Sequence, residues 1–98
     1  MNYTVIDPII VQWAKHNSLT LGTNYKDYEV RSIDIVSRAG NRCQIWIDIP
    51  IDGTVKVHVW NYKKKRIDWD IPVNDLRTCL DQALIVANEW LSEKHITS

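Results

Sequence analysis

The sequence is short of the features that define several large classes of protein. Its 98 residues contain no run of the ~18 to 20 apolar residues that a membrane-spanning helix needs. Twelve Lys and Arg residues balance twelve Asp and Glu residues, so no overall charge attracts nucleic acid or an anionic membrane. Cys43 and Cys79, the two cysteines, lack the CxxC spacing of a zinc or redox motif. These absences leave a cytosolic globular protein as the expected class.

Signals for export and for catalysis are also missing. The first residues, MNYTVIDPIIVQW, have no basic start, and Asp7 and Pro8 interrupt their apolar run, so we expect no secretory signal and a cytoplasmic location. No serine stands in the glycine-flanked elbow of a hydrolase, and no set of residues has the spacing of a zinc site. We therefore expect a protein that is not an enzyme, with no catalytic residue, no cofactor and no metal ion.

The composition is that of one folded domain. Hydrophobic residues make up 45% of the chain and charged residues 24%, which is ordinary globular usage and argues against disorder. A chain of 98 residues has room for a single core, so residues 1–98 are expected to form one domain.

Two stretches have the three-to-four-residue rhythm of an amphipathic helix. Asp7 and Pro8 predict a helix start, because aspartate can cap the first N–H groups and proline at the first helical position loses no hydrogen bond. This helix should end near residues 16–18, and residues 19–27 are expected to form a polar connection. Asn74 can cap a second helix over residues 75–93.

Between the two helices, apolar and polar residues alternate as in β-strands. We expect four strands joined by hairpins, over residues 29–37, 42–49, 54–62 and 66–71. Isoleucines and valines hold the odd positions of the middle strands, so one face of the sheet should be apolar. The expected fold is α+β: a four-stranded antiparallel meander with the N- and C-terminal helices packed on that face, in the order α-β-β-β-β-α.

The other face should carry large aromatic side chains, because Trp46 and Trp60 fall on its polar side. Strand pairing should place Trp46 near His58, Trp60 opposite Asp68, and His58 opposite Asp70. Aromatic side chains ringed by arginine and carboxylates are typical of protein interfaces. The candidate partner-binding residues are therefore Trp46, Asp48, His58, Trp60, Tyr62, Arg66, Asp68 and Asp70.

This face allows several interpretations. It can bind a different protein, it can be covered by a second copy of the chain in a homodimer, or its aromatic pairs can stabilise the sheet alone. It can also stack unpaired bases while the four adjacent positive charges of residues 63–66 contact phosphates. His58 is expected to be a charge-paired surface residue, because no nucleophile accompanies it.

The order of a helix, an antiparallel sheet and a C-terminal helix, together with the stretch YKDYEV, resembles the double-stranded RNA-binding domain. The lysine-rich start of that family's last helix is replaced here by VNDLRT, residues 73–78. A fourth expected strand also departs from the family's pattern. This resemblance implies a shared architecture without RNA binding.

Four segments, DPIIVQWAKHNSL, YKDYEVRS, QIWIDIP and VKVHVWNY, are similar to short cytosolic immunity proteins of bacterial contact-dependent and other polymorphic toxin systems. That resemblance spans most of the chain and implies a non-enzymatic protein that binds and occludes one cognate toxin. Carboxylates beside the aromatic side chains would meet a basic toxin surface. An immunity protein is the leading hypothesis, a nucleic-acid-binding module is the alternative, and no membrane partner is expected.

Overall fold

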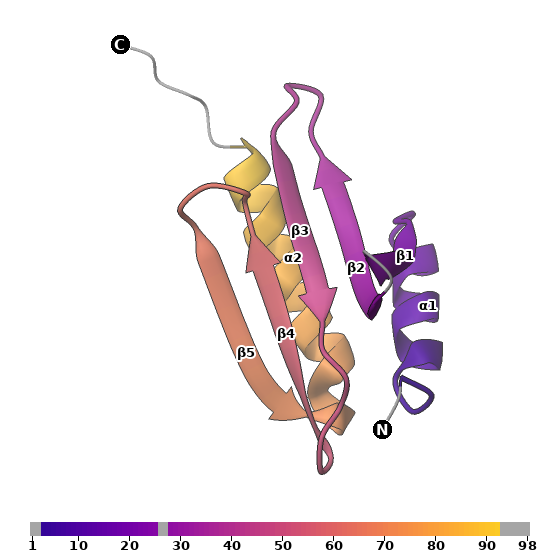
Figure 1. Cartoon of the computed structure of the whole chain (residues 1–98). Helices are drawn as coiled ribbons and strands as arrows, with labels where there is room; N and C mark the ends of the chain where they lie inside the picture. Colours follow the sequence, from indigo (N-terminus) through magenta and orange to yellow (C-terminus); the bar gives the residue numbers. More distant parts are fainter. Residues whose placement is uncertain (1–2, 26–27, 93–98) are drawn as a thin grey trace.

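The computed structural model describes residues 3–25 and 28–92, which form an α+β domain with a five-stranded antiparallel sheet and two α-helices (Figure 1). The elements follow in chain order as α1 (Asp7–His16), β1 (Leu21–Tyr25), β2 (Tyr28–Val36), β3 (Arg42–Ile47), β4 (Thr54–Trp60), β5 (Arg66–Pro72), the 3₁₀ helix η1 (Val73–Asp75) and α2 (Leu76–Ser92). Strands that follow one another in the chain are neighbours in the sheet, which is therefore a meander.

The apolar face of the sheet packs against α2, as the alternation predicted. Ile45, Ile47 and Val57, at odd positions of β3 and β4, are completely buried. Each such side chain contributes roughly 1.5–3 kcal/mol relative to exposure. Helix α2 packs against β3, β4 and β5 and runs behind them in Figure 1. Its buried residues are Leu76, Cys79, Leu80, Ala83 and Ala87.

Helix α1 extends the helical layer toward the β1 side of the sheet (Figure 1). Ile10 and Trp13 are buried in the same core as Ile33 of β2. The indole N–H of Trp13 donates a hydrogen bond of 2.8 Å to Asp81 of α2, so the two helices are joined by a polar contact as well as by packing. Both helices thus contribute to one core on the odd-numbered face of the sheet.

Strand β1 was not predicted, because residues 19–27 were expected to form a polar connection. The segment Leu21–Tyr25 lacks an apolar alternation and is held by backbone pairing with β2, with Leu21 opposite Ile33 and Gly22 opposite Ser32. A side chain at Gly22 would come within 3.0 Å of the Ser32 hydroxyl oxygen, so glycine permits this close approach. Hydrophobic periodicity cannot detect an edge strand of this kind.

Asp7 does not cap α1, contrary to the prediction from the Asp-Pro pair. The N-cap is Ile6, which makes no side-chain cap bond, whereas Pro8 lies in the first turn as expected. The Asp7 carboxylate accepts hydrogen bonds from Nε and Nη2 of Arg31 at 2.6 and 2.9 Å. Arg31 is only 6% exposed and lies 4.2 Å from the Tyr3 ring centroid. A buried guanidinium needs a charged partner, and this requirement outweighs the cap.

Helix α2 also begins differently from the prediction. Its first residue is Leu76, and residues Val73–Asp75 form the 3₁₀ turn η1, whose N-cap makes no side-chain hydrogen bond. Asn74 therefore lies inside this turn and is not the cap of a longer helix. The predicted last helical residue, at position 93, lies outside the described part of the chain.

Replacing Asp7 with asparagine should lower the free energy of unfolding by about 2 kcal/mol at neutral pH, because it removes the carboxylate that forms an ion pair with the buried Arg31. The hydrogen bond from Arg31 holds the pKa of Asp7 below its usual value. The stabilisation is therefore present above the unfolded-state pKa of about 3.9 and is lost as the pH falls through the lower folded-state pKa.

Urea unfolding of wild type and Asp7→Asn at neutral pH and between about pH 4 and 2 measures this difference. The free energies of unfolding of the two proteins should become equal toward the acid end of this range. The exposed Asp75, replaced by asparagine, is the matched control and should change stability much less than Asp7→Asn at neutral pH. A loss that stays constant with pH would contradict the role given to the Asp7 charge.

Candidate functional site

Three neighbouring strands bring the central site residues into one row on the polar face of the sheet. Trp46 of β3 lies opposite His58 of β4, as predicted. His58 in turn lies opposite Asp68 of β5, whereas the prediction paired it with Asp70. The predicted pairing of Trp60 with Asp68 is wrong by the same shift of two residues, because Trp60 lies opposite Arg66. A two-residue shift keeps every side chain on its face and changes only its neighbours.

The loop between β4 and β5 explains the shift. The side-chain oxygen of Asn61 accepts hydrogen bonds from the backbone N–H groups of Lys63 and Lys65, at 2.9 and 3.1 Å. Tyr62 adopts a left-handed backbone conformation with φ 64°. Strand β4 therefore ends at Trp60, and residues 61–65 form the loop, where the sequence predicted that β4 would continue to residue 62.

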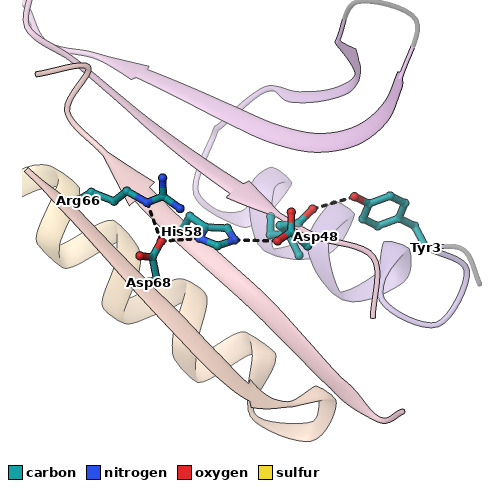
Figure 2. Close-up of polar contacts among 6 residues, drawn as sticks. Tyr3, Asp48, His58, Arg66 and Asp68 are labelled. Atoms are coloured by element: carbon teal, nitrogen blue, oxygen red, sulfur yellow. Dashed lines mark hydrogen bonds and ion pairs between the residues drawn. The ribbon is translucent and has the colours of Figure 1, made fainter. Parts of the chain in front are cut away.

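His58 is buried at the centre of the polar face, although it was expected on the surface. It is 7% exposed. Nδ1 lies 2.5 Å from Asp68 and Nε2 lies 2.8 Å from Asp48 (Figure 2). The Trp46 ring stacks on the imidazole with centroids 4.5 Å apart and an interplanar angle of 18°. Both ring nitrogens of the buried imidazole therefore have a polar partner within hydrogen-bond distance.

Arg66 completes this arrangement from β5. Its Nε donates a 2.8 Å hydrogen bond to the same Asp68 oxygen that contacts His58, and its guanidinium carbon lies 4.9 Å from the Trp46 ring centroid. The hydrogen bonds from His58 and then from Arg66 lower the pKa of Asp68. Asp68 therefore carries a negative charge at neutral pH and contacts both His58 and Arg66. We call this group the histidine cluster: Trp46, Asp48, His58, Arg66 and Asp68.

A second group lies beside the histidine cluster, and we call it the tyrosine cluster: Asp34, Arg42, Trp60 and Tyr62. The rings of Trp60 and Tyr62 are 4.6 Å apart. The guanidinium of Arg42 lies 4.6 Å from the Tyr62 ring centroid, and the Tyr62 hydroxyl donates a hydrogen bond to Asp34. Asp34 and Arg42 were not predicted. Their even-numbered positions on β2 and β3, in phase with Trp46, were the signal that could have identified them.

Asp70 was also predicted to belong to the site, but it lies in neither cluster. It is exposed on the same face, opposite Lys56 of β4. The lysine-rich loop approaches the tyrosine cluster, since the indole N–H of Trp60 lies 3.4 Å from the Lys63 carbonyl oxygen. Both acidic and basic groups are therefore exposed at the borders of the two clusters.

An open groove of about 380 Å³ adjoins the histidine cluster through Asp48. Its lining residues are Tyr3, Val30, Asp48, Ile49, Ile51, Thr54 and Lys56. The Tyr3 hydroxyl donates a 2.9 Å hydrogen bond to the Ile47 carbonyl and lies on the Asp48 side of His58 (Figure 2). This contact fastens the N-terminal segment to the end of β3, so the wall of the groove is held in place.

Other chemically active groups lie away from this face or are not arranged as a site. Cys43 and Cys79 are buried thiols and do not form a disulfide. Burial raises the pKa of Cys79 to about 11, which keeps it in the thiol form at neutral pH. Over residues 3–25 and 28–92, no three His, Cys, Asp or Glu side chains are grouped so that they could hold a metal ion.

Comparison with known proteins identified no relative of this chain. No protein-family model, no curated protein and no solved structure matches this chain at a significant level. Among the helices in the described part of the chain, none is long and apolar enough to cross a membrane. Function is therefore inferred from the geometry of the two clusters.

Replacing His58 with glutamine should raise the pKa of Asp68 toward its ordinary value, because it removes the largest cause of the lowering. Arg66→Gln should raise it by a smaller amount. Carbonyl-detected NMR titration of the aspartate side chains measures both shifts. Arg77→Gln, on the exposed surface of α2, is the control and should leave the titration of Asp68 unchanged. If the pKa of Asp68 is the same in His58→Gln as in the wild type, the contact between His58 and Asp68 is not formed in solution.

Proposed function

We propose that this chain is a non-enzymatic binding protein and that the polar face of its sheet docks on a partner protein. The observation that carries the proposal is the histidine cluster, in which Trp46, His58 and Arg66 are fixed by mutual stacking and by carboxylates. Tryptophan, tyrosine and arginine dominate the binding energy of protein interfaces. Side chains that are already ordered lose little conformational entropy on binding, so this arrangement favours affinity.

Three exposed carboxylates around the histidine cluster favour a partner with basic side chains at this part of the face. Asp48 and Asp68 have side chains that are 48% and 52% exposed, so each keeps oxygen surface that a partner can reach beyond its contact with His58. Asp70 adds a further exposed carboxylate beside them. Complementary charge speeds association and sets orientation more than it adds affinity.

Within this class, we propose an immunity protein that neutralises a cognate bacterial toxin domain in the cytoplasm. The resemblance of four sequence segments to such proteins supports the partner class. The exposed carboxylates support it as well, because toxin domains that act on nucleic acid present basic active sites. Neutralisation requires only that the bound protein blocks access to the toxin's substrate.

Nucleic-acid binding remains the alternative, and one observation favours it: the exposed lysine-rich loop lies beside the aromatic rings of Trp60 and Tyr62. Against it, the Trp46 ring already stacks on His58 and contacts Arg66, so a base would have to displace one of them. Steep weakening of binding to single-stranded DNA or RNA with rising salt would identify this alternative. A homodimer through the same face would instead give a concentration-dependent mass in solution.

Trp46→Ala and Trp60→Ala should each weaken binding to the proposed cognate toxin domain by about thirtyfold, because such anchors contribute about 2 kcal/mol or more. Isothermal titration calorimetry measures the affinity, and bacterial growth during co-expression with the toxin measures neutralisation. Ile85→Ala removes an exposed apolar side chain from α2, away from the polar face, and should retain both activities.

Thermal unfolding of each variant separates a lost contact from a lost fold. Trp60→Ala is the more decisive variant, because Trp60 lies outside the histidine cluster and its ring contact is with Tyr62. If folded Trp46→Ala and Trp60→Ala bind and neutralise as well as Ile85→Ala, the polar face is not the binding surface.

A further inference from the structure

Strand β5 forms one outer edge of the sheet, and β1 forms the other. The pairing of β1 with β2 is irregular between Gly22 and Asn24, and irregularities of this kind make an edge poorly suited to further pairing. Strand β5 pairs with β4 without interruption from Arg66 to Pro72. It is therefore the edge with the regular geometry that an added strand requires.

The backbone groups of β5 have a defined direction. Val73, just after the strand, donates its N–H to the Gly53 carbonyl, and the ladder of an antiparallel pair uses every second residue. The odd-numbered residues of β5 consequently bond to β4, and the N–H and C=O groups of Asp68 and Asp70 point away from the sheet. Within residues 3–25 and 28–92, no strand lies beyond them.

The side chains of Asp68 and Asp70 determine which kind of strand can pair with the outer edge of β5. Both are exposed on the polar face, two residues apart. A second copy of β5 is a poor match. Any antiparallel register that pairs the outward-facing, even-numbered residues of both copies over more than half of the strand sets an aspartate opposite an aspartate. A strand with lysine or arginine at alternate positions is complementary, since its basic side chains would lie opposite the two carboxylates.

We propose that the outer edge of β5 receives an extended segment of a partner protein as an additional antiparallel strand, with basic side chains opposite Asp68 and Asp70. This mode of binding deepens the proposed function and rests on it for the identity of the partner. The segment would continue the sheet beside the histidine cluster, because Asp68 belongs to both surfaces. Backbone hydrogen bonds would supply affinity, and the alternating charges would supply selectivity.

Edge pairing can be measured without the toxin by adding a capped seven-residue peptide of alternating lysine and valine to the isotopically labelled protein. Amide hydrogen exchange followed by NMR should slow about tenfold or more at Asp68 and Asp70 when the peptide is bound. The amides of Ile67 and Trp69, already bonded to β4, should change much less. A peptide of alternating glutamate and valine is the control and should bind about tenfold or more weakly.

Two variants at position 70 separate the contribution of the backbone hydrogen bond to peptide binding from that of the carboxylate charge. Asp70→Pro removes an outward N–H and no bond to β4, so the protein should fold while the protection at Asp68 disappears. Asp70→Asn keeps that N–H and should reduce affinity only a few-fold. Binding of the lysine peptide without protection at Asp68 and Asp70, or equal binding of both peptides, would overturn the proposal. Either result would leave the role of Trp46 and Trp60 untouched.

Discussion

The register of β4 between β3 and β5 is the constraint on which the rest of the molecule depends. It sets Trp46, His58 and Asp68 side by side across three strands. The same register places the valines of β4 against α2 on the opposite face. A shift by one residue would bury His58 in the apolar core and expose the valines, so the core and the polar face specify the same pairing.

The histidine cluster behaves as a small polar core on the outer face of the sheet. His58 is almost fully buried and both of its ring nitrogens contact carboxylates, so the cost of removing it from water is offset by hydrogen bonds. Asp68 is shared between His58 and Arg66, which links the stacked rings to β5. The polar face therefore has an ordered centre, while the side chains of Asp48, Asp68 and Arg66 remain about half exposed.

Much of this arrangement could be predicted from the sequence, because strand alternation is a strong signal. The odd-numbered core and the pairing of Trp46 with His58 follow from it. The register of β5 could not be predicted, since it depends on hydrogen bonds that Asn61 makes within its loop. Strand β1 has no apolar pattern, and the pairing of Asp7 with Arg31 joins residues that only the fold brings together. The burial of His58 likewise arises from neighbours on three strands.

The central claim is the proposal that the polar face of the sheet binds the partner protein. Cross-saturation NMR on the labelled protein bound to the unlabelled toxin domain proposed as its partner tests this claim most directly, because only protons close to the partner lose intensity. The indole N–H signals of Trp46 and Trp60 should weaken, while that of Trp13, which bonds to Asp81 between the helices, should not change. Loss of intensity confined to the exposed surface of α2, with both polar-face indoles unaffected, would contradict the claim.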